Sequence, residues 1–317
     1  MMDIIGRIMR LIRLPNLVII ILIQVLLRYC IIRPILFSQA PEMISGSIDF
    51  FLLVFTTIVI AAGGYIINDY FDIPIDEVNK PGKNAIGKWL NEKDILLGYW
   101  LINGLAVIIG FFLAFRLKSL TFGLIFPVIS ILLWFYSARY KRTFLLGNII
   151  ISVLSALVIL IVWYFEFLHL RLNPGNFVIV LDQIKLTTRF FLAYSLFAFL
   201  VSLFREIIKD LEDVKGDQQN GCVTLPVVMG MKKTKGIIAS VILLVFLLVI
   251  YCSWIAFNLD MMGIFFYLLV VVEIPLIYLL VKIFLAQKDE DFHFLSSLCK
   301  IIMVAGILTM QLISVGN

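Results

Sequence analysis

Two acidic clusters in the sequence share the spacing D-x-x-D-x-x-x-D. Their members are Asp69, Asp72 and Asp76 in the first cluster and Asp210, Asp213 and Asp217 in the second. In a helix, these offsets place all three carboxylates on one face, because the helix repeats about every 3.6 residues. Asn68 adds an amide oxygen on the face of the first cluster. Clustered hard oxygen ligands suit Mg²⁺, which bridges carboxylates to substrate phosphates. The clusters therefore predict a site for magnesium and a diphosphate.

Basic side chains near the clusters are candidates for binding the diphosphate. They are Lys80, Lys83, Lys141, Arg142 and Lys209. A blander interpretation is a pair of solvated acidic loops, and for Lys141 and Arg142 the bias of basic residues toward one membrane side is an equal explanation. The repetition of one spacing at two membrane edges favours the diphosphate site over the solvated loops.

The composition is that of an integral membrane protein. Hydrophobic residues make up 62% of the 317 residues and charged residues only 15%, with a mean hydropathy of +1.07. A soluble domain is roughly half apolar and a quarter charged. The net charge of +5 comes without a basic stripe in a polar setting, so we expect no nucleic-acid partner. The four cysteines form no C-x-x-C pair and predict neither a disulfide framework nor a zinc site.

Apolar stretches long enough to cross a bilayer predict an all-α polytopic membrane protein with one domain, residues 1–317. The nine expected spans are 16–36, 47–67, 94–115, 119–138, 144–166, 188–206, 237–257, 262–285 and 294–315. Residues 1–15 predict a basic helix in the headgroup layer, and the first span lacks a cleavage pattern, so it is expected to be retained. Residues 167–187 predict a surface loop, and Glu273 and Pro275 predict a kink in the eighth span.

The lysines and arginines predict the orientation of the chain in the cell's inner or plasma membrane. With the N-terminus in the cytoplasm, most of the 26 basic residues lie on the cytoplasmic side, as the positive-inside rule requires. The opposite side holds Arg28, Arg33, Arg116, Lys118, Arg171, Lys185 and Arg189. Both acidic clusters then lie on the cytoplasmic face, although only the basic residues were used to choose the orientation.

Five segments resemble motifs of the UbiA superfamily of intramembrane prenyltransferases. NDYFDIPID (68–76) resembles its first Asp-rich motif and DLEDVKGD (210–217) its second. GDQQNGCVTLPVVMG (216–230) is similar to the extension of the second motif, FYSARYKR (135–142) resembles the Tyr- and Lys-containing third motif, and RLIRLPN (10–16) resembles the opening R-x-x-N. Two departures stand out: Tyr136 and Lys141 are five apart rather than four, and Lys83 replaces the arginine that commonly follows the first motif.

The resemblance implies nine helices around a central cavity, with a cytoplasmic cap of two Asp-rich loops and an isoprenyl diphosphate between two magnesium ions. It implies Asn68, Asp72 and Asp76 on one ion and Asp213 and Asp217 on the other, with Asp69 and Asp210 as shared or supporting ligands. The expected catalytic residues are Asp72, Asp76, Asp213, Asp217 and Lys141. The expected diphosphate contacts are the five basic residues given above together with Tyr136 and Tyr140. The expected residues of the acceptor or prenyl pocket are Arg13, Asn16 and Arg139.

The lipophilic acceptor is left open by the residues. DIPIDEVNKP (72–81) is most similar to the branch of the superfamily that alkylates geranylgeranylglyceryl phosphate with geranylgeranyl diphosphate. An aromatic acceptor, such as 4-hydroxybenzoate, dihydroxynaphthoate or homogentisate, is the alternative. A cation-coupled transporter is the rival from another class, but it would place acidic residues at mid-membrane rather than at helix ends. A CDP-alcohol phosphotransferase would need D-G-x-x-A-R, which the sequence lacks.

Overall fold

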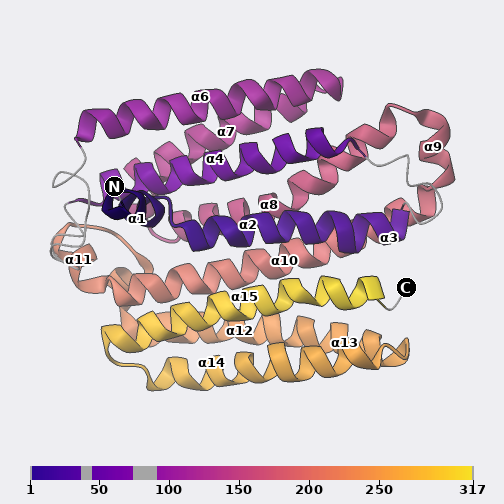
Figure 1. Cartoon of the computed structure of the whole chain (residues 1–317). Coiled ribbons are helices and arrows are strands. Elements are labelled where there is room, and N and C mark those ends of the chain that lie inside the picture. Colours follow the sequence, from indigo (N-terminus) through magenta and orange to yellow (C-terminus); the bar gives the residue numbers. More distant parts are fainter. Residues whose placement is uncertain (1, 37–44, 74–90, 316–317) are drawn as a thin grey trace.

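The computed structural model describes residues 2–36, 45–73 and 91–315, and every regular element in these ranges is helical (Figure 1). Nine segments in them are long and apolar enough to cross a membrane. The first combines α2 (Leu14–Leu26), a π-helical turn (Leu27–Ile32) and α3 (Arg33–Leu36). The others are α4 (Ser47–Phe71), α6 (Glu92–Arg116), α7 (Leu120–Ala138), α8 (Leu146–Arg171), α10 (Leu181–Glu212), α12 (Leu225–Asn258), the pair α13 (Met262–Tyr267) and α14 (Ile274–Leu285), and α15 (Asp289–Val315). The predicted all-α fold and its nine spans are confirmed.

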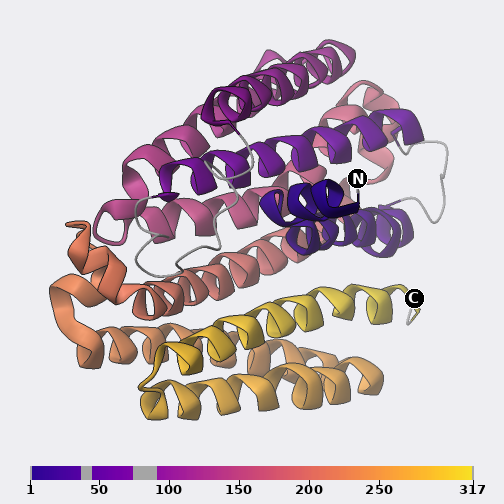
Figure 2. The ribbon, with the colours of Figure 1, turned by 60° about the vertical axis from the view of Figure 1, so that its left-hand side comes forward.

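Consecutive spans alternate in direction, so the acidic sequences gather at one end of the bundle (Figures 1 and 2). We call this end, which carries Asp72, Lys141 and Asp213, the acidic end. The short helices α1 (Met2–Leu11) and α11 (Val214–Gln219) lie there, at the left of Figure 1. The helix α9 (Pro174–Ile179) lies at the opposite end.

Helix α10 joins two apolar cores. Its first part, up to Ala198, packs in a core with α2, α4, α6, α7 and α8, whereas its later part, from Leu200, packs with α12, α14 and α15. The contacts of α10 with α8, α12 and α15 are among the most extensive between helices of the described residues. This central position brings the second acidic cluster, at the end of α10, beside α8.

The predicted surface loop over 167–187 is wrong. Helix α8 continues to Arg171, and α10 already begins at Leu181. Buried side chains at Leu168, Leu170 and Ile184 stabilise these extra turns, and apolar burial outweighs the turn-forming residues between them. The predicted break survives only around Asn173, where a proline at the first position of α9 fits a helix start.

The irregularity predicted in the eighth span is a π-helical turn over Leu268–Glu273. Glu273 is buried at its end, and the Ser253 hydroxyl donates a hydrogen bond of 2.5 Å to its carboxylate. A π-helical turn before a proline lets backbone groups that the proline leaves without a hydrogen bond find other partners. Pro275 stands two residues on, at the start of α14.

A buried ion pair fixes the first span against α8. Arg28, in the first π-helical turn, lies 3.2 Å from the Glu166 carboxylate, and both side chains are almost fully buried. The Ser45 hydroxyl donates to Glu166 at 2.8 Å and accepts from Arg28 at 2.9 Å. The guanidinium also lies 4.3 Å from the centre of the Phe50 ring. Each charge therefore has partners that offset its removal from water.

We expect Glu166→Gln to destabilise the fold strongly. The change keeps the shape but leaves the buried Arg28 without its counter-charge, which costs about 3–5 kcal/mol in comparable buried pairs. Thermal unfolding in detergent would measure the loss. Replacing both partners with apolar residues should restore most of the stability. The matched control is Asp182→Asn, which breaks an exposed pair with Lys185; equal stability of the two single variants would contradict the expectation.

Candidate active site

The first acidic cluster lies at the end of α4, where the helix terminates at Asp72. Asp72 donates its backbone N–H to the Asn68 carbonyl at 3.0 Å. The Asn68 amide in turn donates to Oδ2 of Asp72 at 2.7 Å, and both side chains are buried. Residues four apart on a helix are neighbours, so the sequence spacing itself produces this pair. Asp76, Lys80 and Lys83 lie outside the described residues.

The third motif holds the end of α4 in place. Residues Tyr140–Arg142 form one 3₁₀ turn between α7 and α8. Nζ of Lys141 donates a hydrogen bond to Oδ2 of Asp72, and the Arg142 guanidinium donates to the Phe71 carbonyl at 3.0 Å. Burial works against the charge on Lys141, but the neighbouring carboxylate of Asp72 outweighs it and raises the pKa of the ammonium. Lys141 is therefore protonated at neutral pH.

The second acidic cluster does not form one continuous helical face, so that prediction is wrong. Helix α10 ends at Glu212, Asp213 lies between the helices with φ −96° and ψ 7°, and Asp217 lies on the single turn of α11. Asp217 is buried, and Thr224 Oγ1 donates to its Oδ2 at 3.0 Å. Burial raises the pKa of Asp217, and the charge of Asp213 adds to the shift. The break turns α11 away from the axis of α10.

The two acidic clusters lie within electrostatic range of each other near Lys141. Asp217 interacts electrostatically with both Lys141 and Asp72. The backbone N–H of Val223, just beyond the second cluster, donates to the Arg142 carbonyl at 2.9 Å. Lys141 therefore pairs with the first cluster and lies within electrostatic range of the second. That the two clusters close over one site stays a prediction.

The opening motif also reaches the first cluster. Arg13 lies between α1 and α2 with a left-handed backbone (φ 51°), and its guanidinium donates to Oδ1 of Asp69 at 2.7 Å. It lies 5.1 Å from the centre of the Tyr65 ring, a cation–π distance. Burial opposes the charge of Arg13, but Asp69 outweighs it and raises the pKa.

Glu206, Arg205 and Asn148 lie beside the second acidic cluster, although the sequence analysis did not select them. Glu206 is buried between Arg205 at 2.5 Å and Lys209 at 3.1 Å. Asn148 donates to Asp210 at 2.8 Å from α8. Glu206 and Lys209 are three residues apart on α10, a spacing that could have identified that pair, whereas Asn148 is 62 residues from Asp210 and gave no local signal.

The tyrosines and Arg139 of the third motif have different surroundings. Tyr136 is buried and lies within electrostatic range of Lys141, Glu206 and Asp72. Tyr140 places its ring 6.3 Å from that of Phe135, centre to centre. Arg139 is exposed, and among the described residues its side chain makes no hydrogen bond or ion pair. Of the two tyrosines, Tyr136 is therefore the one within electrostatic range of both acidic clusters.

The donor set suits a hard divalent cation by its chemistry. Asn68, Asp72, Asp213 and Asp217 supply oxygen ligands, which Mg²⁺ prefers. In the described ranges, no three His, Cys, Asp or Glu side chains surround a common metal position. Lys141 provides the positive charge at Asp72 instead. By donor type the residues fit magnesium: they would hold the ion through carboxylate and amide oxygens.

Comparison with known proteins identifies the family. Residues 34–300 match the UbiA prenyltransferase family. This chain belongs to the UbiA family. It is therefore a prenyltransferase and an integral membrane protein. Curated relatives include the digeranylgeranylglyceryl phosphate synthase of Methanothermobacter thermautotrophicus, 30% identical over 87% of this chain and 88% of the relative. The synthase of Sulfolobus acidocaldarius is also 30% identical, over 83% of this chain and 85% of the relative.

Solved structures share the UbiA fold over nearly the whole chain. One is described as giving insights into digeranylgeranylglyceryl phosphate synthase in membranes; it matches with a TM-score of 0.63 at 21% identity, over 97% of this chain and 98% of the other. A UbiA homolog from Archaeoglobus fulgidus bound to DMAPP and Mg²⁺ matches with a TM-score of 0.54 at 15% identity, over 96% and 98% of the two chains. The nine-helix arrangement is therefore that of the UbiA family.

Thr224→Val is expected to reduce turnover about tenfold while the protein stays folded. The change preserves the side-chain shape but removes the hydroxyl that orients Asp217, and a hydrogen bond to a charged group is worth about 1.5–3 kcal/mol. Steady-state kinetics across a magnesium titration would measure the effect. Thr234→Val is the matched control, because that hydroxyl donates only to the Gly230 carbonyl of its own helix. Equal kinetics for the two variants would rule out an orienting role for Thr224.

Proposed function

We propose that this UbiA-family chain catalyses the magnesium-dependent transfer of a geranylgeranyl group from geranylgeranyl diphosphate to geranylgeranylglyceryl phosphate. The observation that supports the proposal is the position of Lys141, which pairs with Asp72 of the first cluster and lies within electrostatic range of Asp217 of the second. The choice of acceptor is supported by relatives named digeranylgeranylglyceryl phosphate synthase that cover most of the chain.

The acidic end supplies both signs of charge that diphosphate binding needs. In the proposal, Asn68, Asp72, Asp213 and Asp217 hold magnesium, with Asp76 added from the sequence motif. When bound, Mg²⁺ would neutralise charge on the diphosphate oxygens. Lys141 would exchange its partner Asp72 for the diphosphate, because the ammonium can pair with either anion. Asp69 and Asp210 already have partners in Arg13 and Asn148 and would support the ligands instead.

The reaction breaks the bond between C1 of the prenyl group and the diphosphate oxygen. The leaving diphosphate keeps the electron pair, and Lys141 stabilises the charge that develops on it. The acceptor hydroxyl oxygen then forms the new bond to C1 and releases its proton. Phe71, next to Asp72, begins a cluster of rings that includes Trp134 at 5.4 Å between ring centres. Aromatic faces of this kind favour the allylic cation and exclude water.

The acceptor phosphate requires a cationic partner, and Arg13 is the proposed one. Its guanidinium lies at the membrane edge between Asp69 and the Tyr65 ring, and it is partly exposed. A guanidinium can bind phosphate through two parallel hydrogen bonds. With the acidic end on the cytoplasmic side, as the basic residues favour, the acceptor would present its phosphate from the inner leaflet.

The test is product identification with purified protein. The full chain in detergent would receive Mg²⁺, labelled geranylgeranyl diphosphate and, separately, geranylgeranylglyceryl phosphate, 4-hydroxybenzoate, dihydroxynaphthoate and homogentisate. We expect a diether phosphate from the first acceptor, identified by mass, and no product after chelation of the metal. Farnesyl diphosphate in place of the geranylgeranyl donor would test the chain length.

The alternative outcomes separate the rival functions. Prenylation of an aromatic acceptor but not of the glyceryl phosphate would overturn the acceptor assignment and keep the chemistry. The transporter hypothesis is disfavoured because Asp72 and Asp213 lie at helix ends, where a mid-membrane ion pathway does not run. Release of no diphosphate with any acceptor, from protein that is folded, would overturn the proposed function.

A further inference from the structure

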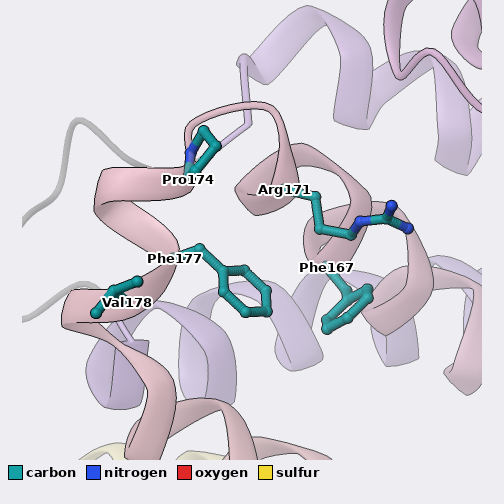
Figure 3. A pocket seen from close by; sticks show the side chains of 5 residues that line it. All are labelled: Phe167, Arg171, Pro174, Phe177 and Val178. Carbon is teal, nitrogen blue, oxygen red and sulfur yellow. The ribbon is translucent and has the colours of Figure 1, made fainter.

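A groove opens at the end of the bundle opposite the acidic end, between α8 and α9 (Figures 1 and 3). It encloses about 370 Å³ and is lined by Phe167, Arg171, Pro174, Phe177 and Val178. Helix α8 contributes the first two residues and α9 the others. With 26 residues in α8, the groove lies roughly 40 Å from the acidic clusters at 1.5 Å per residue. It therefore belongs to neither the diphosphate nor the acceptor site.

The groove wall is mostly apolar, and much of it is uncovered. The rings of Phe167 and Phe177 meet edge to face, 5.7 Å apart between centres, and Figure 3 shows them side by side. Val178 is 71% exposed, and the neighbouring Ile179 is 65% exposed. Exposed apolar side chains of a membrane-spanning chain contact lipid rather than water. In a chain that crosses the membrane, this surface favours a lipid chain over a water-soluble ligand.

Arg171 is the charged residue of the groove wall. It is the last residue of α8 and is exposed, and among the described residues its side chain makes no ion pair or hydrogen bond. A guanidinium that has no carboxylate partner in the described part of the chain suits a phosphate, which it can bind through two parallel hydrogen bonds. The groove therefore combines a cationic group and an apolar wall on two consecutive helices, α8 and α9.

The position along the spans fits the same ligand. Helix α8 ends at Arg171 and α10 begins at Leu181, so the groove lies at the membrane surface, where lipid phosphates are found. We propose that this groove binds an anionic membrane lipid, with its phosphate at Arg171 and its chain along Phe167, Phe177 and Val178. The proposal does not depend on the reaction at the acidic end.

The bound lipid would brace the bundle through a chain of aromatic contacts. Phe167 contacts Trp163 at 6.2 Å between ring centres, and Trp163 stacks on the buried ring of Phe191 at 5.4 Å. Trp163 belongs to α8 and Phe191 to α10, the two helices that carry the core. A ligand that binds only the folded state raises its stability, so lipid binding should raise the melting temperature.

Native mass spectrometry of the full chain, released from detergent, would test the proposal. The delipidated protein would be titrated with phosphatidylglycerol, phosphatidylcholine or inorganic phosphate, and thermal unfolding would be recorded in parallel. The variants are Arg171→Gln, which removes the charge at an exposed site, and Phe177→Ala, which shortens the apolar wall. The matched control is Arg189→Gln, an exposed arginine of the same membrane half outside the groove.

We expect phosphatidylglycerol to be retained about tenfold more strongly than phosphatidylcholine, because its phosphate has no choline cation beside it and keeps a net negative charge for Arg171. Arg171→Gln should abolish this preference, and Phe177→Ala should weaken the binding of both lipids. Arg189→Gln should behave as the wild type. Equal losses in Arg171→Gln and Arg189→Gln would mean general charge attraction and would overturn the proposal. Binding of inorganic phosphate with the same affinity as the lipid would overturn it too, because the apolar wall would then contribute nothing.

Discussion

Asp72→Asn is expected to lower kcat about a thousandfold while the protein remains folded. Asparagine keeps the size of the side chain and an oxygen that can accept from Asn68, so the end of α4 is preserved. The variant loses the negative charge that faces Lys141 and, in the proposed reaction, holds magnesium. Loss of one charge-stabilising group of this kind costs about 10²–10³ in rate, and a lost metal ligand adds to it.

The measurement is initial rate against magnesium concentration, with thermal unfolding as the check on folding. Asp213→Asn should show a loss of the same order, because it lies in the second cluster. Glu290→Gln is the matched control, an exposed carboxylate at the start of α15 on the same membrane side. Wild-type activity in either aspartate variant, with normal magnesium dependence, would reject the proposed metal assignment.

Lys141→Met is expected to separate diphosphate binding from magnesium binding. The variant removes the ammonium that stabilises the leaving diphosphate, so kcat/KM should fall about 10²–10³-fold. The same ammonium occupies Oδ2 of Asp72 in the structure, where it competes with a cation for the carboxylate. Without diphosphate, magnesium should therefore bind the variant more tightly than the wild type, as calorimetric titration would measure.

Opposite signs of the two effects are the diagnostic feature of this prediction. A residue that only stabilised the fold would weaken both kinds of binding together. Lys141→Arg should recover part of the activity, because it retains the charge. Lys215→Met is the matched control, since Lys215 forms an exposed pair with Asp289 at the same end of the bundle. Weaker magnesium binding to Lys141→Met than to the wild type would contradict the competition between Lys141 and the metal.

The sequence by itself determined the spans and the position of the chemistry along them. A stretch of about 20 apolar residues must cross the bilayer as a helix, because lipid offers the backbone no other hydrogen-bond partner. Asn68 and Asp72 pair as their spacing requires, since four residues make one helical turn. The alternation of spans then brought the ends of α4 and α10 and the turn between α7 and α8, which carry Asp72, Asp213 and Lys141, to one end of the bundle. These features depend only on local sequence and on chain direction.

Only the tertiary structure decided which residues meet. In a membrane-spanning helix, apolar residues cover every face, so periodicity does not reveal the packed face. The contacts of Lys141 with Asp72, of Asn148 with Asp210 and of Arg28 with Glu166 each join different spans. Such contacts depend on the rotation and depth of each helix, which side-chain packing sets. The turn at Asp213, which redirects the second cluster, was decided at the same level.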